Sequence, residues 1–408
     1  MGPLRRSPDY RWLYAGQFSS AMARQMTVVA APYQVFVLTG SSLAVGLLGL
    51  AQLAPLLAVS LVGGAVADAV DRRRLLLVMQ GLLGVTALGL AVNAAVAAPR
   101  VWPVFALSAL NAGFSGIDSP TRNAVIPALL ERDDLPAAYA LNQTLSTVAH
   151  AVGPMLGGLV IARASLTAAY GLEAAGFVIA AFNMMPIRSL PPVGGSRRVA
   201  MASILEGLRF LRSRRLLQAC FVIDLNAMVF GMPRALFPAL GTEVFGGDAA
   251  TVGFLYAAPG TGAMVGAVTA GWVGAVRRQG RAVILAVVVW GAAIAMFGLT
   301  SWLPLALILL GVAGAADVVS AVFRNTILQL SVPDGLRGRL SAIHVAVVGG
   351  GPRLGDFEAG TVAAIASPRV SVVSGGLVCV IGTLVIARLM PELVRYVHPP
   401  QAAPEPAA

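Results

Sequence analysis

The sequence has few charged residues and no lysine. Only 12% of its 408 residues are charged, and all 29 basic residues are arginines. A soluble domain carries about 25% charged residues, so this composition excludes one. An apolar share of 57% and a mean hydropathy of +0.80 also exclude a disordered chain. The composition therefore predicts a polytopic membrane protein.

Cysteine and histidine are scarce as well. The two cysteines, Cys220 and Cys379, both lie inside apolar runs, which excludes a disulfide or zinc scaffold. The three histidines, His150, His344 and His398, lie far apart, and the sequence contains neither a Walker A run nor a nucleophile elbow. We therefore expect no enzymatic activity and no cofactor, and we expect the proton gradient to be the source of energy.

Apolar sequence is what the chain has in abundance. A helix needs about 20 apolar residues to cross a bilayer, and the chain offers roughly twelve such segments. The first segment is too long for a signal peptide and has no cleavage-site pattern. The predicted spans start near Trp12, Ser42, Leu75, Val101, Ala138, Leu166, Leu216, Thr251, Ala282, Leu303, Leu340 and Val370.

The arginines predict the orientation of these spans. If the N-terminus is cytoplasmic, 21 arginines fall in inside segments, three outside and five within spans. This asymmetry follows the positive-inside rule and places both termini in the cytoplasm of a multi-pass protein of the inner (cytoplasmic) membrane. Because the net charge of +11 is spread through short loops, we expect no nucleic-acid partner. The expected partners are the lipid bilayer and a small-molecule substrate, and we expect a monomer.

The longest loop divides the chain into two halves. Residues 189–215 begin with a Pro- and Gly-rich stretch, followed by Ile204, Leu205, Leu208 and Leu211 at helical spacing. This pattern predicts a linker with an amphipathic helix at the inner membrane surface. We therefore expect an N-terminal six-helix bundle at 1–188, this linker, a C-terminal six-helix bundle at 216–392 and a disordered cytoplasmic tail at 393–408.

The two halves repeat each other. A shift of about 207 residues aligns Gly46 with Gly253 and Gly64 with Gly271, and a shift of about 201 brings Arg122 near Arg324. Two matches in order at nearly one offset predict two tandem bundles. They would be related by a pseudo-twofold axis along the membrane normal, with a site at their interface.

Several motifs resemble a known family. The segment Gly64–Arg74 (GAVADAVDRRR) resembles the loop signature G-x-x-x-D-R-x-G-R-R of the major facilitator superfamily, with Ala69 and Asp71 replacing the usual Arg and Gly. The run GPMLGG at residues 153–158 resembles the G-P-x-x-G-G signature of antiporter members, which implies export. Residues 252–258 and 351–356 are similar to the enterobactin-exporter branch. The resemblance implies an all-α fold of twelve transmembrane helices in two pseudo-symmetric bundles.

Charged residues near the cytoplasmic ends of spans are candidates for gating. Asp118 and Arg122 are four apart and Asp317 and Arg324 are seven apart, so each pair shares a helix face. The resemblance implies that Asp68, Asp118 and the arginines after Asp71 form an inner charge cluster, a latch that breaks when the cytoplasmic side opens. The alternative is that these arginines only anchor the topology. The full set is Gly64, Asp68, Asp71, Arg72, Arg73, Asp118, Arg122, Asp317 and Arg324.

Carboxylates inside spans are candidates for proton coupling. An ionisable group in a span costs about 2.5–3.5 kcal/mol, so it needs a partner or a water-lined cavity. Arg353 and Asp356 are three apart and can pair, whereas Glu358 points about 200° round the helix from Asp356. Asp356 or Glu358 is the first candidate, followed by Glu173 and Asp224. In the alternative, these acids form static ion pairs, or Glu358 lies at the outer water interface.

A polar stripe in the fifth span is expected to line the central cavity. Tyr139, Gln143, Ser146 and His150 follow one another at intervals of four, three and four residues, and such a face does not fit against lipid. The motif residues Gly153, Pro154, Gly157 and Gly158 follow in the same span. They permit a kink or close helix packing.

Arg24 is the most isolated cation of the predicted spans. It either receives an anionic or catecholate-like substrate or neutralises a carboxylate of another helix. With Tyr256 and Arg353 it completes the candidates for substrate binding. We therefore expect a secondary transporter that exports an amphipathic small molecule, a siderophore or a hydrophobic drug, by proton antiport and alternating access. An importer or facilitator, or a non-transporting receptor or assembly partner, is the alternative.

Overall fold

The computed structural model describes residues 2–191 and 201–398, except for the side chains of 61, 62, 64, 65, 67, 68, 201–205, 334, 335, 337–339, 341 and 342. The predictions for 192–200 of the linker and for 399–408 of the tail lie outside the described residues, as do those for the side chain of Asp68 and for the surroundings of Gly64. In the described part, regular structure is exclusively helical.

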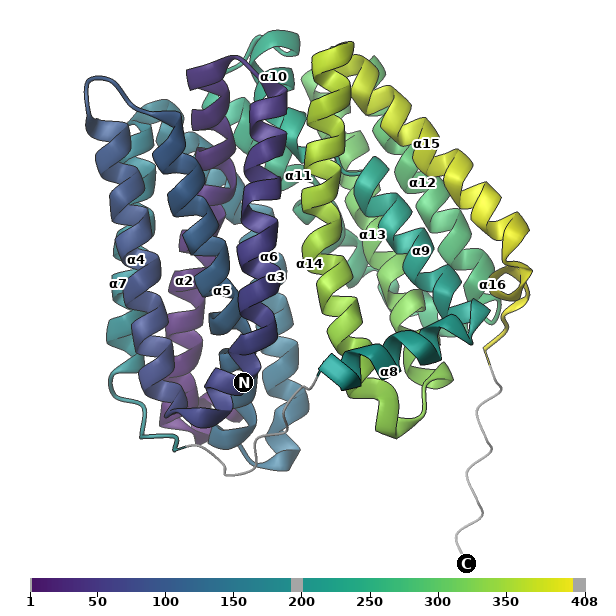
Figure 1. Ribbon diagram of the computed structural model, residues 1–408, viewed down its shortest axis with the longest axis horizontal. Helices are drawn as coiled ribbons and strands as arrows, with labels where there is room; N and C mark the ends of the chain where they lie inside the picture. Colours follow the sequence, from purple (N-terminus) through teal and green to yellow (C-terminus); the bar gives the residue numbers. More distant parts are fainter. Residues whose placement is uncertain (1, 192–200, 399–408) are drawn as a thin grey trace, which may run out of the picture.

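The N-terminal bundle is formed by six long helices (Figure 1, purple to blue). A short helix α1 (Gly2–Arg6) precedes them, and a turn η1 (Arg132–Asp134) lies between the fourth and fifth. The six are α2 (Pro8–Thr39), α3 (Ser42–Ala69), α4 (Arg72–Ala95), α5 (Val101–Leu129), α6 (Leu135–Arg163) and α7 (Leu166–Met184).

The C-terminal bundle stands beside the first (Figure 1, teal to yellow). Helix α8 (Met201–Arg212) leads into it along its lower edge, and Phe210 and Leu211 pack against a small apolar cluster there. The remaining elements are α9 (Arg215–Phe230), η2 (Arg234–Leu236), α10 (Phe237–Ala239), η3 (Leu240–Val244), α11 (Ala249–Val268), η4 (Ala270–Ala275), α12 (Gln279–Leu299), α13 (Leu303–Ser331), α14 (Asp334–Ile365), α15 (Pro368–Leu389) and α16 (Pro391–Arg395).

These helices satisfy the length that a membrane requires. Among the described residues, nine segments are long and apolar enough to span a bilayer. Helices α2, α5 and α14, with 32, 29 and 32 residues, are also long enough by length alone. Together they fit the predicted twelve spans. The predicted starts lie within six residues of the observed ones, and the largest difference is between Leu340 and Asp334.

Short polar side chains set where many spans begin. Ser7 and Asp71 cap α2 and α4 on the side of the molecule where the described chain starts and ends, which we call the termini side. Ser41, Ser165 and Ser367 cap α3, α7 and α15 on the opposite, far side. Each of these side chains accepts a hydrogen bond from a backbone N–H of the first turn that no helical carbonyl can satisfy.

The bundles touch mainly through two helix pairs, α3 with α14 and α6 with α11. Both pairs are in close backbone contact toward the far side. A Cβ at Gly46 would lie 2.5 Å from the Asp356 carbonyl oxygen, and a Cβ at Gly158 would lie 2.7 Å from Cα of Gly253. Glycine therefore allows the four helices to meet backbone to backbone, and the far side is closed.

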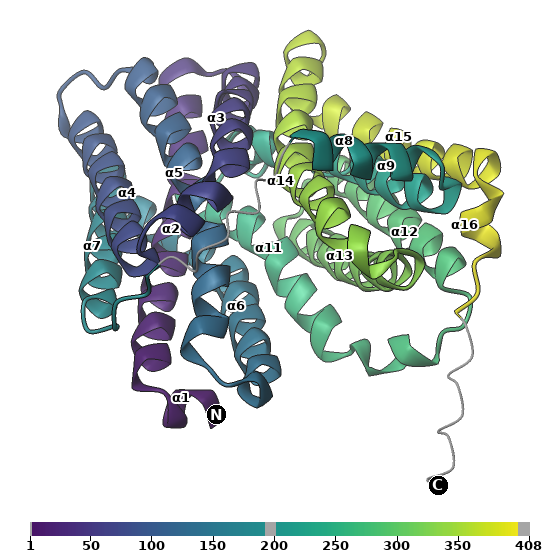
Figure 2. The ribbon, with the colours of Figure 1, turned by 60° about the horizontal axis from the view of Figure 1, so that its bottom comes forward.

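The same helices separate toward the termini side. On α14, Val345 lies on the cavity-facing stripe that continues through Val348 and Pro352, yet its side chain is 61% exposed. On α6, Tyr139 is 49% exposed one helical turn beyond Gln143. The view turned toward this side shows the two bundles diverging (Figure 2). The space between the bundles therefore opens toward the termini side.

Candidate functional site

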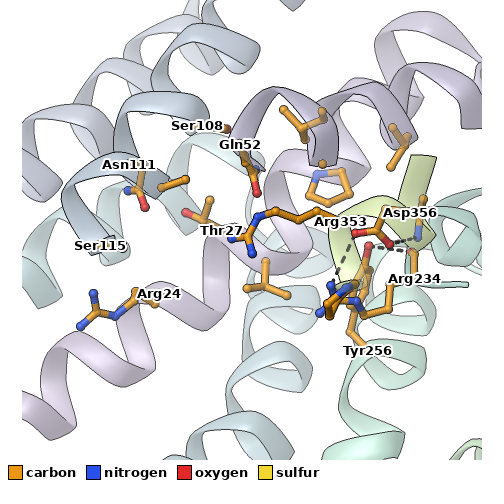
Figure 3. A pocket seen from close by; sticks show the side chains of 18 of the residues that line it. Arg24, Thr27, Gln52, Ser108, Asn111, Ser115, Arg234, Tyr256, Arg353 and Asp356 are labelled. Carbon is orange, nitrogen blue, oxygen red and sulfur yellow. Dashed lines mark hydrogen bonds and ion pairs between the residues drawn. The ribbon is translucent and has the colours of Figure 1, made fainter. Parts of the chain in front are cut away.

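A cavity between the bundles has two adjoining compartments. The first, of about 360 Å³, we call the arginine compartment, because Arg24, Arg234 and Arg353 line it together with Gln52 and Asn111 (Figure 3). The second, of about 490 Å³, we call the aromatic compartment. Its lining includes Phe237, Tyr256, Trp290, His150 and Asp317. Val28, Arg234, Tyr256 and Val348 line both compartments, so the two form one continuous site.

A break in the seventh span shapes this site. Helix α9 ends at Phe230, and Gly231, Met232 and Pro233 separate it from η2. Proline lacks an N–H and cannot continue the ladder of helical hydrogen bonds, so backbone groups at the break need other partners. Trp290 Nε1 donates to the Gly231 carbonyl at 2.7 Å.

Two further side chains hold the other end of the break. The Tyr256 hydroxyl donates to the Arg234 carbonyl at 2.9 Å, and the Ala235 N–H donates to Asp356 Oδ1 at 3.1 Å. Three helices of the same bundle, α11, α12 and α14, thus supply the partners that irregular backbone requires at membrane depth.

The arginine compartment carries an excess of positive charge. Its lining contains three guanidinium groups and one carboxylate, Asp356. Asp356 Oδ2 lies 3.5 Å from Arg234 Nη2, and Arg353 Nη1 donates instead to the carbonyl of Gly349 at 2.6 Å. In the described part of the chain, Nε of both Arg234 and Arg353 is buried without a hydrogen-bond partner. Each arginine uses one terminal nitrogen in the contacts above, so its other terminal nitrogen remains as a donor for an anionic ligand in the cavity that both side chains line.

Arg24 also belongs to a buried cluster of the N-terminal bundle. Fully buried Asp118 accepts hydrogen bonds from Arg24 Nη2 at 3.0 Å, Arg122 Nε at 2.7 Å and Gln80 Nε2 at 2.7 Å. The predicted pairing of Asp118 with Arg122 on one helix face is present. Of the two roles considered for Arg24, the structure shows the neutralisation of a carboxylate, and the exposed side of Arg24 still lines the cavity.

The C-terminal bundle contains a cluster with the opposite balance. Arg324 Nη2 lies 2.7 Å from Asp224 and 4.0 Å from Asp317, and Arg324 Nη1 donates to Ser320 at 2.9 Å. Two carboxylates share one guanidinium here, whereas Asp118 alone faces Arg24 and Arg122 in the other bundle. Of the two acids, Asp317 is the one that lines the cavity.

The remaining predicted acids lie away from the cavity lining. Glu173 on α7 is fully buried and accepts a hydrogen bond from the Thr27 hydroxyl, while its Oε1 has no partner in the described part of the chain. Glu358 lines neither compartment and shares a stripe of α14 with the exposed Leu354 and Ile365. Its contribution to proton coupling stays a prediction without support from the geometry.

Helix α6 presents most of its predicted polar stripe to the cavity. Gln143, Ser146 and His150 line the aromatic compartment, whereas Tyr139 does not. His150 Nδ1 lies 2.7 Å from the Ser146 carbonyl of the preceding turn.

The Gly-Pro motif of α6 lies where helices approach closely. The helix continues through Pro154. A Cβ at Gly153 would lie 2.4 Å from Cβ of Gln25, and one at Gly157 would lie 3.2 Å from Cα of Met26. With the contact of Gly158 described above, these glycines seat α6 against both α2 and α11.

The loop with the signature sequence is tied to the start of the linker. Asp71 accepts hydrogen bonds from the Ser189 hydroxyl and from the N–H of Leu190 at 3.1 Å, and Arg73 donates to the Met185 carbonyl. Partial burial opposes ionisation of Asp71, but these hydrogen bonds and those from the first turn of α4 keep its pKa below the ordinary value. Asp118 contacts Arg24 and Arg122, and the inner charge cluster of Asp68, Asp118 and the arginines after Asp71 stays a prediction.

Sequence reasoning did not select three residues that organise the site. Arg234, Trp290 and Thr27 are not among the site residues that the sequence predicts. The sequence Gly-Met-Pro-Arg inside an apolar run was the available signal, because proline interrupts a span and frees backbone groups.

Comparison with known proteins identifies the family. Residues 1–406 match the family model described as transmembrane secretion effector. The enterobactin exporter EntS of Citrobacter koseri is 30% identical over 397 residues, which cover 97% of this chain and 95% of that protein. EntS of Shigella boydii is 30% identical over 400 residues, covering 98% and 96%. The chain belongs to the transmembrane secretion effectors of the major facilitator superfamily. It is a multi-pass membrane transporter and not an enzyme.

Solved structures share the major facilitator fold at low sequence identity. The nucleoside transporter NupG is 12% identical with a TM-score of 0.74, and the match covers 95% of this chain and all of that one. A bacterial homologue of the human lysosomal transporter Spinster, in an inward-facing and unoccupied conformation, is 13% identical with a TM-score of 0.69 and 95% coverage of both chains.

Proposed function

We propose that this major facilitator transporter exports an amphipathic small molecule with an anionic group from the cytoplasm in exchange for protons. The observation that supports this proposal is the arginine compartment. Three guanidinium groups line this cavity between the bundles, and Asp356 is the one carboxylate among its lining residues. A ligand anion that hydrogen-bonds a guanidinium gains about 1.5–3 kcal/mol per bond. The apolar part of the molecule would occupy the aromatic compartment.

The arginine asymmetry supports a cytoplasmic termini side in an inner membrane. Short loops on that side hold most of the arginines, which the positive-inside rule assigns to the cytoplasm. The cavity opening then faces the cytoplasm, where an exported molecule must enter. Closing this side and opening the far side would release the molecule outside, so both states of alternating access use one site.

The names of the relatives suggest the first substrate to test. They are named enterobactin exporters, and a siderophore of that kind is our leading candidate for this chain. A hydrophobic drug is the second candidate, because aromatic and apolar side chains dominate the larger compartment. We further propose that the transporter acts as a monomer in the lipid bilayer, without cofactor or nucleic acid.

Transport into proteoliposomes tests this proposal. The purified protein is reconstituted, a pH gradient is imposed, and both the movement of enterobactin and the internal pH are recorded. We expect enterobactin to move against its gradient while protons move the other way. We expect Arg353→Gln to weaken the apparent affinity about tenfold, the equivalent of one lost charge-assisted hydrogen bond.

Arg369→Gln is the matched control, because Arg369 is a partly exposed arginine on the far side that donates to Ser301 and lines neither compartment. Enterobactin movement that is the same with and without the pH gradient would identify a facilitator. Accumulation in the opposite direction would identify an importer. Binding without any movement would favour a receptor or assembly partner.

A further inference from the structure

Helix α5 carries a polar stripe that leads from the Asp118 cluster into the arginine compartment. Ser108, Asn111, Ser115 and Asp118 follow one another at intervals of three, four and three residues, so they share one helix face. Asp118 is engaged in the cluster described above. The other three line the arginine compartment, as does Gln52 of the neighbouring helix α3 (Figure 3). We call Gln52, Ser108, Asn111 and Ser115 the polar face.

The two serines of the polar face lack the hydrogen bond that is usual inside a helix. A helical serine or threonine commonly donates to the carbonyl three or four residues earlier, as Ser20 and Thr121 do at 3.2 and 2.7 Å. In the described part of the chain, neither Ser108 nor Ser115 makes a side-chain hydrogen bond. Ser108 is also only 2% exposed, and a buried hydroxyl without a partner is unfavourable. A ligand group that enters the compartment can supply this partner.

The amide of Asn111 is oriented by its neighbour on α4. The Thr86 hydroxyl donates its one hydrogen to the Leu83 carbonyl at 2.8 Å, so Thr86 can only accept from Asn111. The Asn111 atom that lies 3.2 Å from Thr86 is therefore the amide nitrogen. Neither Asn111 Oδ1 nor the Gln52 amide makes a hydrogen bond with the described residues. The polar face thus offers unused donors and acceptors but no charge.

The polar face lines the same compartment as guanidinium groups of the other bundle. Arg234 and Arg353 come from η2 and α14, and the Arg353 side chain extends toward the side where Gln52 lies (Figure 3). We propose that the polar face binds an uncharged hydroxyl or amide group of the exported molecule, while the arginines bind its anionic group. This inference rests on the proposed function and narrows its substrate class to anions that also carry such a group. Catecholate-like molecules belong to this class.

The composition of the face fits an uncharged ligand group. Hydroxyl and amide side chains both donate and accept, so they match groups that do the same. Among the described residues, Arg24 is the one charged side chain that the N-terminal bundle contributes to this lining, and Asp118 already binds it. An analogue without the uncharged group would displace water and leave Ser108 and Asn111 unpaired. Sites built to hydrogen-bond a ligand discriminate strongly against such analogues.

Four naphthalene probes with chains of equal length test the inference. The compound 4-(2-naphthyl)butyrate carries only a carboxylate. N-(2-naphthoyl)glycine adds an amide, 3-hydroxy-4-(2-naphthyl)butyrate adds a hydroxyl, and N-ethyl-2-naphthamide keeps the amide but lacks the carboxylate. Binding to the purified full-length protein is measured by isothermal titration calorimetry against a detergent blank. We expect the amide or the hydroxyl anion to bind at least about tenfold more tightly than 4-(2-naphthyl)butyrate, and the tighter of the two identifies the group.

Substitutions assign this preference to the polar face. Ser108→Ala and Asn111→Leu should each reduce the preference severalfold, while continued binding of 4-(2-naphthyl)butyrate shows that the variants are folded. Ser108→Ala should not lower the melting temperature, because the hydroxyl has no partner in the described part of the protein. Ser20→Ala is the matched control, since Ser20 is a fully buried serine of α2 that donates to the Gln17 carbonyl and lines neither compartment. This variant should keep the preference.

The outcomes separate the polar face from the anion site. Equal binding of the three anions to the wild type would mean that the polar face binds only water, and it would overturn the inference. No binding of any probe, or an unchanged preference in both Ser108→Ala and Asn111→Leu, would overturn it as well. If N-ethyl-2-naphthamide bound as tightly as N-(2-naphthoyl)glycine, the anion site of the proposed function would be refuted. Failure of the flux experiment would refute export and leave these binding results standing.

Discussion

Asp71 shows how one side chain can join three segments of the chain. It caps α4 through the N–H of Arg74 at 3.0 Å and also accepts from Ser189 and Leu190 at the start of the linker. The N–H of Arg72 returns a hydrogen bond to the Leu190 carbonyl at 3.1 Å. The family signature has glycine at this position, so the aspartate adds a connection between the loop and the linker.

Replacing Asp71 by alanine should lower the free energy of unfolding by about 1–3 kcal/mol, from the lost cap and the lost hydrogen bonds. Asp71→Asn should cost less, because an amide oxygen still accepts. Since folding lowers the pKa of Asp71, the advantage of wild type over Asp71→Asn is full above the ordinary carboxyl pKa of 3.8. This difference in the free energy of unfolding should disappear as the pH falls through the lowered pKa of Asp71 in the folded state.

Unfolding in mixed detergent micelles measures these differences, with Asp133→Ala, an exposed acid of η1, as the control. A loss in Asp71→Ala no larger than in Asp133→Ala would contradict the connection.

Single residues also show where sequence reasoning reaches its limit. The pairing of Asp118 with Arg122 could be predicted, because four residues of helix bring the two side chains together. The partner of Arg324 could not, because Asp224 lies on another helix about 100 residues earlier in the chain. Arg353 and Asp356 are close enough along α14 to pair, yet Arg234 approaches Asp356 from η2 instead.

At the scale of the helical element, apolar length is the strongest sequence signal. The starts of α3, α5, α7 and α13 coincide with those expected, since serine caps and polar turns bound the apolar runs there. The break after α9 was not expected. Its stability depends on Trp290, Tyr256 and Asp356 from three other helices, and such long-range partners are invisible in a local pattern.

Removing one of these partners should loosen the break. Tyr256→Phe keeps the ring against Phe237 but leaves the Arg234 carbonyl without its donor, a loss of about 1–3 kcal/mol for a buried group. We expect a lower melting temperature in detergent and, because Arg234 is positioned by this backbone, a weaker apparent affinity for enterobactin in the proteoliposome assay. Tyr33→Phe is the control, since the structure gives the Tyr33 hydroxyl no hydrogen bond among the described residues. Equal effects of the two substitutions would show that the hydroxyl does not hold the break.

At the scale of the whole molecule, glycines decide which side can close. A Cβ at Gly253 would lie 2.8 Å from both Cα of Gly158 and the Pro154 carbonyl oxygen, both in the other bundle. The sequence placed Gly46 and Gly253 at equivalent positions of the two repeats, and the structure puts each at an interface between the bundles on the far side. Each repeat thus contributes one glycine contact that closes the far side, and the two contacts match.

A larger side chain at this contact should shift the transporter toward opening on the far side. Gly253→Val inserts atoms where backbone now touches backbone, and overpacking of this kind costs about 1–3 kcal/mol. This cost applies only to the state described here, which is closed on the far side. It therefore shifts the equilibrium about 5- to 150-fold toward the state that is open on the far side. Spin labels at Ala97 and Ala366, exposed in far-side turns of the two bundles, should then report a longer distance. Gly171→Val on α7 is the control, because a Cβ there meets nothing within 4 Å. If Gly253→Val and Gly171→Val gave the same distance distribution as the wild type, the glycine contact would be a packing detail and not the closure of the far side.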